Sequence, residues 1–572
     1  MTRPRFPVFE TRQFDNLTFE CSQRASFPVC SVLWHSCGAV VGIEFDYIIV
    51  GAGSAGCVLA NRLSASGKHK VLLLEAGPPD RNPWIHIPMG YGKLFSHPEL
   101  NWRYQTAPEP ELNGRSIYHP RGKVLGGSSS INGLVYMRGQ HRDYDLWRQM
   151  GCDGWGWDDV LPYFKRSMDQ TRGGSTWHGT DGPLAVSDQR ETHPLCDAFI
   201  AAGVETGLPL NSDFNGADQE GVGYFQTTAR NGWRCSSATG YLRPTRGRKN
   251  LEIITGAHVT RLIMEGLRAT GVRFIREGIE EEVFARGEVL LSAGAINSPQ
   301  ILELSGIGDG DRLPALGVEL VHHAPNVGAK LQDHLQARLV MQASKPVTVN
   351  DLYHSTWGRI SMAARYALLR KGPLAVSAGY ACAFFKTHDA LETPDIQVHF
   401  ICFSTDKMGE ALHPFSGFTA SVCQLRPESR GDVHIASADP FLQPVIRCNY
   451  LSTETDRRTN VEGLKKLRRI INAPALASFL DREMEPGSSV GNDEDLLAYC
   501  RETASTIYHP CATCAMGTDR GSVTSPDLKV NGVDGLRVID ASIMPRLVSG
   551  NINAAVIMIA EKAADIILSD AR

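Results

Sequence analysis

Apolar residues from Phe45 onward fall into the short runs and helical spacings that are typical of an α/β protein. Residues 45–50 form an apolar run that ends at Gly51, and residues 71–75 form another, so both predict buried strands. Between them, residues 57–63 have the apolar spacing of a helix. The order strand, helix, strand predicts two parallel strands joined by a crossover helix.

Later segments extend this pattern and then depart from it. Further strand-like runs occupy residues 251–254, 288–291 and 536–540. From about residue 336 to 500 the character changes: residues 416–422 and 431–435 predict antiparallel strands, and residues 461–472 predict a helix. We therefore expect two discontinuous domains of an α/β protein, a parallel-sheet domain from residues 45–160, 220–335 and 500–572, and a mixed α+β domain from residues 161–219 and 336–499.

The N-terminal 44 residues do not share the pattern of the rest of the chain. They contain neither an apolar run long enough to span a membrane nor the charged start, apolar centre and cleavage site of a signal peptide. We expect them to be a disordered extension.

Composition excludes several classes of protein. The chain has 572 residues, of which 42% are hydrophobic, and 58 Lys+Arg against 62 Asp+Glu give a formal charge of −4. These values are those of a globular protein, and the balanced charge gives no electrostatic reason to expect a nucleic acid or an anionic membrane as partner. The 14 cysteines are scattered through a chain too large to need disulfides, which favours free thiols in a reducing, cytoplasmic compartment.

A glycine motif, Gly51-x-Gly53-x-x-Gly56, lies between the first predicted strand and its helix. In this context Gly51 permits a tight turn, Gly53 lets the backbone approach a pyrophosphate, and Gly56 lets helix and strand pack closely. Phosphate oxygens would then meet the free N–H groups of the helix N-terminus. Glu75, which ends the second strand, is placed to accept hydrogen bonds from ribose hydroxyls. The motif predicts a dinucleotide site without separating FAD from NAD; the alternative is a glycine turn that binds nothing.

A second glycine-rich segment, residues 121–133, is also dense in small hydroxyl residues. It contains Gly126, Gly127, Ser128 and Asn132. A loop of this kind offers backbone N–H groups at close range, which suits a flat or phosphorylated ligand. Taken alone, the segment predicts a ligand-binding loop.

Two long signatures make the chain resemble the glucose–methanol–choline (GMC) oxidoreductases, which are FAD enzymes. The first signature is matched over residues 122–145 and the second over residues 294–308. The resemblance extends from about residue 45 to the C-terminus. It implies an α/β fold in which a Rossmann-like FAD-binding domain carries a discontinuous α+β substrate-binding domain.

The same resemblance implies which residues hold FAD. Gly51, Gly53 and Gly56 of the glycine motif, with Glu75, would bind the ADP half. The residues implied at other parts of the cofactor are Gly126, Gly127, Ser128, Asn132 and Val135 against the flavin half, Val259 near the adenine, Asp540 by the ribityl–pyrophosphate, and Asn553 as a flavin neighbour at a helix start. For Asn553, helix capping is the alternative.

His119 lies at the position where some family members attach FAD covalently through a histidine. Other members have a different residue there and bind FAD without a bond. The alternative for His119, which we favour, is a surface or pocket-lining histidine before Pro120.

A pair of catalytic residues is implied near the C-terminus. His509, in the segment Tyr508-His-Pro-Cys-Ala512, matches the family's active-site base, and a histidine titrates near the pH at which a base is needed. Asn551 matches the partner position, which is Asn or His across the family. Ala512 replaces a family glycine, and we expect only a local adjustment there.

Cys511 and Cys514 stand beside the implied base in a Cys-x-x-Cys spacing. A structural zinc site needs four ligands, and no second pair of matching spacing follows. We therefore predict two unpaired thiols and no metal.

The reaction implied is oxidation of a primary alcohol to an aldehyde, with hydride transfer to flavin N5 and His509 as the base. Electrons would pass to a non-NAD acceptor, for which a quinone is favoured over oxygen. Choline is the alternative substrate, although Ala381 stands where choline-oxidising relatives usually have a glutamate. An alternative of another class is a non-redox hydroxynitrile lyase on the same fold.

Partners follow from this reaction. We expect a small-molecule alcohol and an electron acceptor, with no nucleic acid and no membrane span. A quinone-linked enzyme of this kind would be cytoplasmic, with room for peripheral contact at the inner membrane. The oligomeric state is not predicted.

Overall fold

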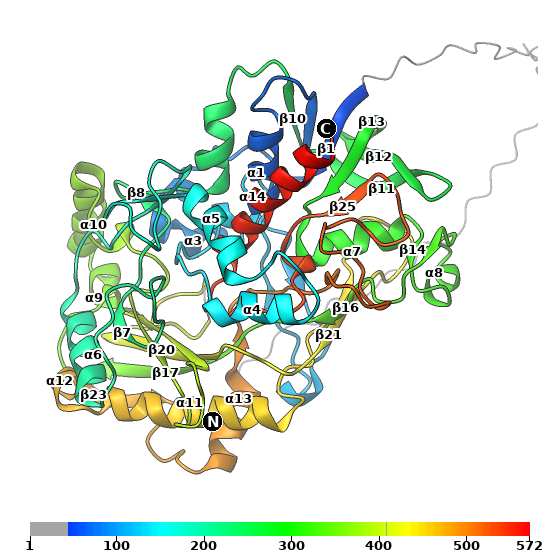
Figure 1. The fold of residues 1–572 in the computed structure, drawn as a ribbon. Helices are drawn as coiled ribbons and strands as arrows, with labels where there is room; N and C mark the ends of the chain where they lie inside the picture. Colours follow the sequence, from blue (N-terminus) through cyan, green and yellow to red (C-terminus); the bar gives the residue numbers. More distant parts are fainter. Residues whose placement is uncertain (1–43, 408, 572) are drawn as a thin grey trace, which may run out of the picture. The chain divides into compact units, whose positions relative to one another are not determined.

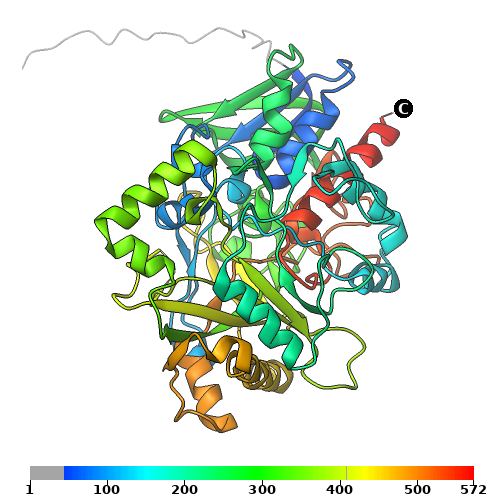
Figure 2. The ribbon, with the colours of Figure 1, turned by 90° about the vertical axis from the view of Figure 1, so that its left-hand side faces the viewer.

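The computed structural model describes residues 44–407 and 409–571. The expected N-terminal extension lies outside the described residues, except for Glu44, which begins the first strand. The described chain holds two large sheets, and the first lies above the second in both ribbon views (Figures 1 and 2).

The first sheet is built largely from the strands that the apolar runs predict. Its strands follow the order β10-β2-β1-β13-β12-β11, and β25 pairs with β13 beside β1. Their bounds are β1 (Glu44–Val50), β2 (Val71–Glu75), β10 (Leu251–Thr255), β11 (His258–Glu265), β12 (Arg268–Arg276), β13 (Ile279–Leu291) and β25 (Leu536–Val538). The crossover helix between β1 and β2 is α1 (Ser54–Leu63), so the predicted strand–helix–strand start is confirmed.

Five strands of this sheet, β10, β2, β1, β13 and β25, run parallel. Their carboxyl ends therefore meet at one edge, which is where ligands bind in open α/β sheets. The edge carries Gly51 after β1, Glu75 at the end of β2, Ser292 after β13 and Asp540 after β25. Residues from both ends of the chain thus converge at this edge.

Two helices from opposite ends of the described chain pack together over this sheet. They are α1 and α14 (Asn553–Asp570), drawn in blue and red in Figure 1. Arg62 on α1 donates to the fully buried carboxylate of Glu561 on α14 at 2.9 and 2.7 Å. The end of α14 is tied down as well, because Arg537 in β25 bridges Glu288 of β13 and Asp570 at 2.7 Å each.

The second sheet is antiparallel and follows the order β23-β17-β20-β19-β18-β7, with β24 also paired to β17. Its strands are β7 (Gly221–Tyr224), β17 (Leu335–Ala343), β18 (Ala381–Phe385), β19 (Ile396–Ile401), β20 (Gly417–Gln424), β23 (Leu480–Glu485) and β24 (Ser505–Thr506). The amphipathic helix α11 (Glu454–Ile471) covers one face of the sheet against β20, where the pattern predicts a helix. A small third sheet joins β16 (Ala329–Leu331), β21 (Gly431–His434) and β22 (Val445–Arg447).

Two short strands lie in the second sheet although their residues fall in ranges expected for the first domain. They are β7, which pairs with β18, and β24, which pairs with β17. Strand pairing at these positions depends on partners more than 150 residues away, which local apolar patterns do not report. The domain boundaries stay a prediction.

The described chain has further helices of six or more residues. They are α4 (His141–Gln149), α5 (Trp157–Ser167), α6 (Pro194–Glu205), α7 (Gly294–Leu304), α9 (Val349–His354), α10 (Thr356–Leu369) and α13 (Asp493–Thr503). Within the described chain, no helix combines the length and apolarity that crossing a membrane requires. Every cysteine in the described residues is free and buried, as the composition predicts.

Candidate cofactor and active site

A cavity of about 330 Å³ extends from the carboxyl edge of the first sheet to a face of the second. At one end its wall includes Gly51, Gly53 and Glu75; at the other it includes His509 and Asn551. The second sheet contributes side chains from β17, β19 and β20, namely Gln336, Arg338, His399, Ile401, Thr419 and Ser421. One continuous space therefore joins the predicted dinucleotide turn to the predicted catalytic pair.

The three glycines of the motif are glycine for different physical reasons. Gly51 has a φ of +95°, and a Cβ there would lie 2.6 Å from the Ser292 carbonyl oxygen. A Cβ on Gly56 would lie 1.9 Å from the Gly51 carbonyl oxygen, so only glycine fits where helix and turn touch. A Cβ on Gly53 would meet nothing nearer than 3.9 Å. Protein packing therefore does not require glycine at position 53. The open space beside Gly53 is what a ligand lying close to the backbone would need.

The second glycine loop packs directly on this turn. A Cβ on Gly127 would lie 2.7 Å from Gly53 Cα, and Gly126 has a φ of +88°. Ser128 and Asn132 line the cavity, and the Ser128 hydroxyl accepts the Gly122 N–H at 3.1 Å. The loop and the turn thus form adjoining walls of one space.

Two carboxylates are found in the described cavity wall, Glu75 and Asp540. Glu75 accepts the N–H groups of Ala52 and Gly77 at 2.9 Å each, and burial raises its pKa to about 7. Asp540 is turned to the protein: it accepts the Gly294 N–H at 2.8 Å and the Ser298 hydroxyl at 2.6 Å. Asp540 therefore fixes the start of α7 at the cavity.

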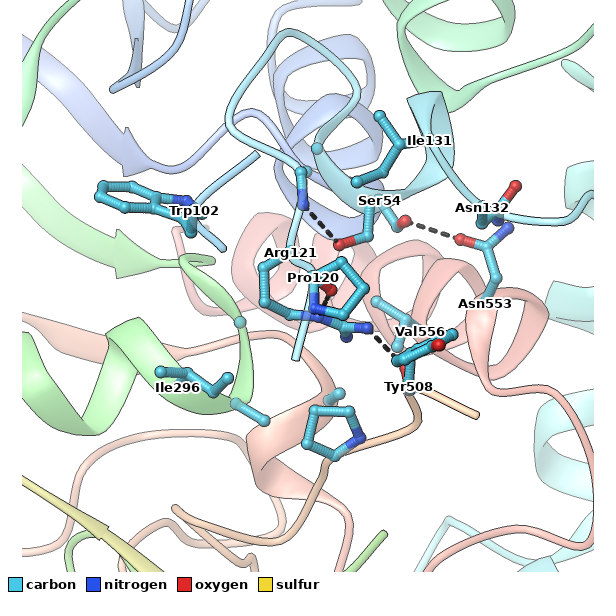
Figure 3. A pocket seen from close by; sticks show the side chains of 18 of the residues that line it. Ser54, Trp102, Pro120, Arg121, Ile131, Asn132, Ile296, Tyr508, Asn553 and Val556 are labelled. Atoms are coloured by element: carbon cyan, nitrogen blue, oxygen red, sulfur yellow. Dashed lines mark hydrogen bonds between the residues drawn. The ribbon is translucent and has the colours of Figure 1, made fainter. Parts of the chain in front are cut away.

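Asn553 and Ser54 join two helix starts (Figure 3). The Ser54 hydroxyl donates to Asn553 Oδ1 at 2.7 Å, so the N-termini of α1 and α14 lie side by side at the cavity wall. Ile552 occupies the N-cap position of α14 and makes no side-chain cap, and the Asn553 side chain accepts from Ser54 on the neighbouring helix. Val135 and Val259 also line the cavity.

His119 lies elsewhere than covalent attachment would require. It is fully buried and is not part of the cavity wall, whereas its neighbours Pro120 and Arg121 are. Its Nε2 lies 3.2 Å from the Tyr450 hydroxyl and 3.3 Å from Asp333 Oδ2. The side chain belongs to a polar cluster behind the loop that carries His509, so the geometry gives no support to a flavin link at His119. The favoured expectation of a surface or pocket-lining histidine is also wrong, because the side chain is fully buried outside the cavity wall.

The two residues predicted to be catalytic lie next to each other in the structure. Asn551 Nδ2 lies 3.2 Å from His509 Nε2, and both residues line the cavity. The loop that carries His509 is held by Arg121, which donates to the Tyr508 carbonyl at 2.7 Å (Figure 3), and by Asp333, which accepts the His509 N–H at 2.7 Å. The imidazole is therefore fixed from its backbone as well as from its ring.

A chain of hydrogen bonds sets the tautomer of His509. The Leu425 carbonyl can only accept, so His334 Nε2, 3.0 Å away, carries a hydrogen. A neutral His334 then has a lone pair on Nδ1, and His509 Nδ1, 3.0 Å from it, must be the donor. The lone pair of His509 is consequently on Nε2, the atom that faces Asn551.

The amide of Asn551 is oriented in the same way. Gln397 Nε2 donates to Asn551 Oδ1 at 3.1 Å. Asn551 Nδ2 is therefore the group that faces His509 Nε2. A donor and a lone-pair acceptor stand side by side, which is the pair of groups that a hydroxyl can bridge.

All three histidines at this end of the cavity are held neutral. Burial, followed by the neighbouring His334, places the pKa of His509 well below its usual value. Burial also lowers the pKa of His334, and it lowers that of His399 to about 4. A base must be unprotonated to act, and the site keeps His509 in that form.

We expect His334 to be a positioning residue whose loss slows the reaction without removing the base. In His334→Phe, His509 Nδ1 loses its acceptor and the Nε2 lone pair is no longer enforced, so kcat/KM should fall about 10- to 100-fold. His334→Gln retains an amide oxygen that can accept from Nδ1 and should recover most of the rate. Steady-state kinetics of both variants test this, and equal losses would contradict it.

Ala512 shows how the chain accommodates the missing family glycine. Its φ is +72°, in the left-handed region that disfavours residues with a Cβ, and it is buried. Relief of the strain in Ala512→Gly, about 1–2 kcal/mol, exceeds the entropy cost of glycine, about 0.4–1 kcal/mol. We expect Ala512→Gly to stabilise the fold by about 0.5–1 kcal/mol, measured as a higher urea midpoint. An unchanged or lower midpoint would show that the turn is unstrained.

Several site residues escaped prediction. Asp333, His334 and Gln397 complete the catalytic end, yet their contacts to His509 and Asn551 span 154 to 176 residues of sequence. Tyr380, Phe384 and Phe385, the aromatic residues around Ala381, are buried outside the cavity wall and belong to the core. Burial raises the pKa of Cys511 and Cys514, so both thiols stay protonated.

The cavity wall fits FAD. Ser54, Gly294 and Asn553 place the N-termini of α1, α7 and α14 at the wall, and such ends favour the negative charge of a pyrophosphate. Gly53 leaves room for close approach, and Glu75 lies at the end of the neighbouring strand.

Comparisons with known proteins agree with this reading. Family models described as GMC oxidoreductase match residues 45–336 and 427–560. An alcohol dehydrogenase [acceptor] of Pseudomonas putida is 46% identical over 92% of this chain and 96% of its own. An oxygen-dependent choline dehydrogenase of Photobacterium profundum is 42% identical over 92% of this chain and 93% of its own.

Solved structures show the same fold. Pyridoxine 4-oxidase from Mesorbium loti has a TM-score of 0.83 at 34% identity, covering 91% of this chain and 98% of its own. Formate oxidase, solved from Aspergillus oryzae in work on FAD modification, has a TM-score of 0.87 at 26% identity, covering 92% of this chain and 99% of its own. With family models matched over most of its length, the chain belongs to the GMC oxidoreductases and is an FAD-dependent enzyme.

Proposed function

We propose that this enzyme oxidises a neutral primary alcohol to an aldehyde, with His509 as the base, and passes the electrons to a quinone-type acceptor. The observation that carries the proposal is the directed chain from the Leu425 carbonyl through His334, which leaves a lone pair on His509 Nε2 beside the Asn551 amide. Relatives named alcohol dehydrogenase [acceptor] and choline dehydrogenase support alcohol oxidation.

The roles of the residues follow from this geometry. A substrate hydroxyl that contacts both groups donates its proton to His509 Nε2 and accepts from Asn551 Nδ2, in place of the direct contact between them. Proton removal makes the alcohol oxygen anionic, and the amide N–H stabilises that charge in a site shielded from water. FAD, when bound, supplies the group that accepts hydride from the alcohol carbon. His509 Nδ1 already carries a hydrogen, which it donates to His334. The proton from the alcohol is therefore accepted at Nε2.

The charge of the cavity favours a neutral substrate over choline. Around the catalytic pair, the described wall contains Arg338 and Arg121 and lacks a carboxylate, since Glu75 and Asp540 belong to the wall near the first sheet. A quaternary ammonium group would meet positive charge without a carboxylate facing it, because Asp333 lies behind His509 and outside the cavity wall. Choline remains the second candidate because of the named relatives.

Anaerobic flavin reduction tests the proposal. Purified holoenzyme is mixed without oxygen with choline, with short and long aliphatic alcohols and with benzylic alcohols, and bleaching of the flavin absorbance is followed. A neutral alcohol should bleach it faster than choline at equal concentration. Bleaching by choline alone would overturn the substrate assignment, and cyanohydrin cleavage without any bleaching would favour a hydroxynitrile lyase.

The acceptor is tested in a second step. Alcohol-reduced enzyme is mixed either with a water-soluble ubiquinone analogue or with air-saturated buffer. The quinone should restore the flavin absorbance faster than oxygen does. Faster recovery with oxygen would make the enzyme an oxidase.

The pH profile should show a base that stays active in mild acid. Because burial lowers the pKa of His509, its neutral form persists as the pH falls through the ordinary histidine value of about 6.5. Activity is lost only when the pH falls through the lowered value, so the acidic limb of kcat/KM should lie below the ordinary histidine value. A limb at or above about pH 6.5 would mean that the imidazole is not buried in the working enzyme.

A further inference from the structure

The helix α10 leaves most of its surface without a protein partner. Only Gly358, Met362 and Tyr366, at intervals of four residues, are buried; every other residue from Thr356 to Leu369 is exposed. The exposed side is apolar: Trp357 is 79% exposed, Ile360 52%, Leu368 81% and Leu369 58%. Residues 357, 360, 364 and 368 fall on one helical stripe, so these side chains form a continuous face.

Neighbouring segments enlarge this face. Leu352 and Tyr353 on the adjacent helix α9 are exposed as well. Both ribbon views place α10 at the periphery of the second sheet (Figures 1 and 2). We call the exposed side chains of residues 352, 353, 357, 360, 368 and 369 the α10 face. Apolar surface of this extent marks an interaction site in soluble proteins.

Charge identifies the kind of partner. Residues 352–375 contain four basic residues and no acidic one, although the whole chain carries a net charge of −4. Arg365 pairs with Glu191, whereas Arg359 and Lys371 form no salt bridge with any described residue. The nearly balanced charge of the whole chain therefore does not exclude a local surface that is both cationic and apolar. The expectation drawn from composition, that nothing favours an anionic membrane, rests on the total charge and does not take this local charge into account.

We propose that the α10 face docks on the surface of an anionic phospholipid bilayer. Tryptophan and leucine side chains enter the boundary between headgroups and acyl chains, and the basic residues beside them meet lipid phosphates. A helix of 14 residues is too short to span a bilayer, so it lies along the surface. A second copy of the chain is a poorer occupant, because a two-fold contact would set the same basic residues against each other.

Docking would bring the cavity close to the bilayer. The chain runs from α10 through residues 373–375 to Ala378, which lines the cavity wall. An apolar alcohol or quinone dissolved in lipid would then be presented near the site. The docking itself is independent of the proposed reaction and is tested without it.

The first test is vesicle sedimentation with the holoenzyme. Vesicles of equal parts phosphatidylglycerol and phosphatidylcholine should carry the enzyme into the pellet, and vesicles of phosphatidylcholine alone should carry much less. Trp357→Ser/Leu368→Ser should lower the partition coefficient about tenfold or more, since it removes two apolar side chains that would insert into the bilayer. The matched control Leu210→Ser/Ile279→Ser changes two residues that are 70% and 66% exposed on other elements, and it should bind as wild type.

The second test addresses charge. Arg359→Glu/Lys371→Glu should abolish the preference for phosphatidylglycerol, while Arg520→Glu, an exposed control, should not. All variants should retain flavin and the wild-type rate with a soluble acceptor, because none of these residues lines the cavity. Wild-type enzyme that stays in the supernatant, or binding unchanged in both double variants, would overturn the proposal. So would a dimer in sedimentation velocity that Trp357→Ser/Leu368→Ser dissociates while vesicle binding is absent.

Discussion

His509→Ala should keep its flavin but reduce it about 10²- to 10⁴-fold more slowly with an alcohol substrate. The lone pair on Nε2 is removed, while the glycine turn, Glu75 and the loop at residues 126–132 are untouched. Cofactor content and the absorbance spectrum should therefore match wild type. Anaerobic stopped-flow mixing measures the rate of flavin reduction directly, without interference from the acceptor.

Two variants make this result interpretable. His388→Ala removes an exposed histidine and should reduce at the wild-type rate. Asn551→Ala keeps the base and removes the donor to the alcohol oxygen, so its loss should be smaller and should not shift the acidic limb of the pH profile. Reduction of His509→Ala at the wild-type rate would refute the role of this residue and the mechanism with it.

Asp333→Ala should destabilise the fold by about 3–5 kcal/mol, the cost of breaking a buried charged cluster. The carboxylate is buried and accepts the Thr506 hydroxyl, the Tyr450 hydroxyl and the backbone N–H of His509. Without it, each of these donors loses its partner away from water. The change is measured as a fall in the urea midpoint, and Asp389→Ala, an exposed aspartate, is the control.

The pH dependence of this effect has a defined sign. Burial would raise the pKa of Asp333, but the hydrogen bond and charge of His119 and the two hydroxyl donors outweigh it and hold the pKa well below the ordinary value. A carboxylate with a depressed pKa stabilises the fold above its unfolded value of about 3.9 and loses that contribution as the pH falls. The gap between wild type and Asp333→Ala should therefore narrow below about pH 4. A gap that is constant with pH would mean that the charge plays no part.

Sequence patterns predict those features whose residues lie close together along the chain. The strand–helix–strand start and the glycine motif lie within residues 45–75, so local spacing predicts both. His509 and Asn551 were predicted only through the family resemblance, because no local pattern singles out one of 18 histidines.

The rest depends on contacts that sequence patterns do not encode. His334 meets His509 across 175 residues, and His119 turns to Asp333 and Tyr450, which come from two other segments. The identity of a residue tells which bonds it can make, but only the folded backbone decides which partner is within reach. His119 shows the difference, because its position left a flavin link open and favoured a surface or pocket-lining side chain, whereas its ring is buried against a carboxylate.

The bridge that Arg537 makes between Glu288 and Asp570 has a consequence for engineering. Glu288 lies opposite Tyr47 in the β1–β13 ladder, so the last turn of α14 ends beside the strand that opens the described chain. A short flexible linker between residues 571 and 44 would join them, and new ends could be opened in an exposed loop. A circularly permuted enzyme built in this way would still assemble its flavin cradle, with both halves of it now encoded next to each other.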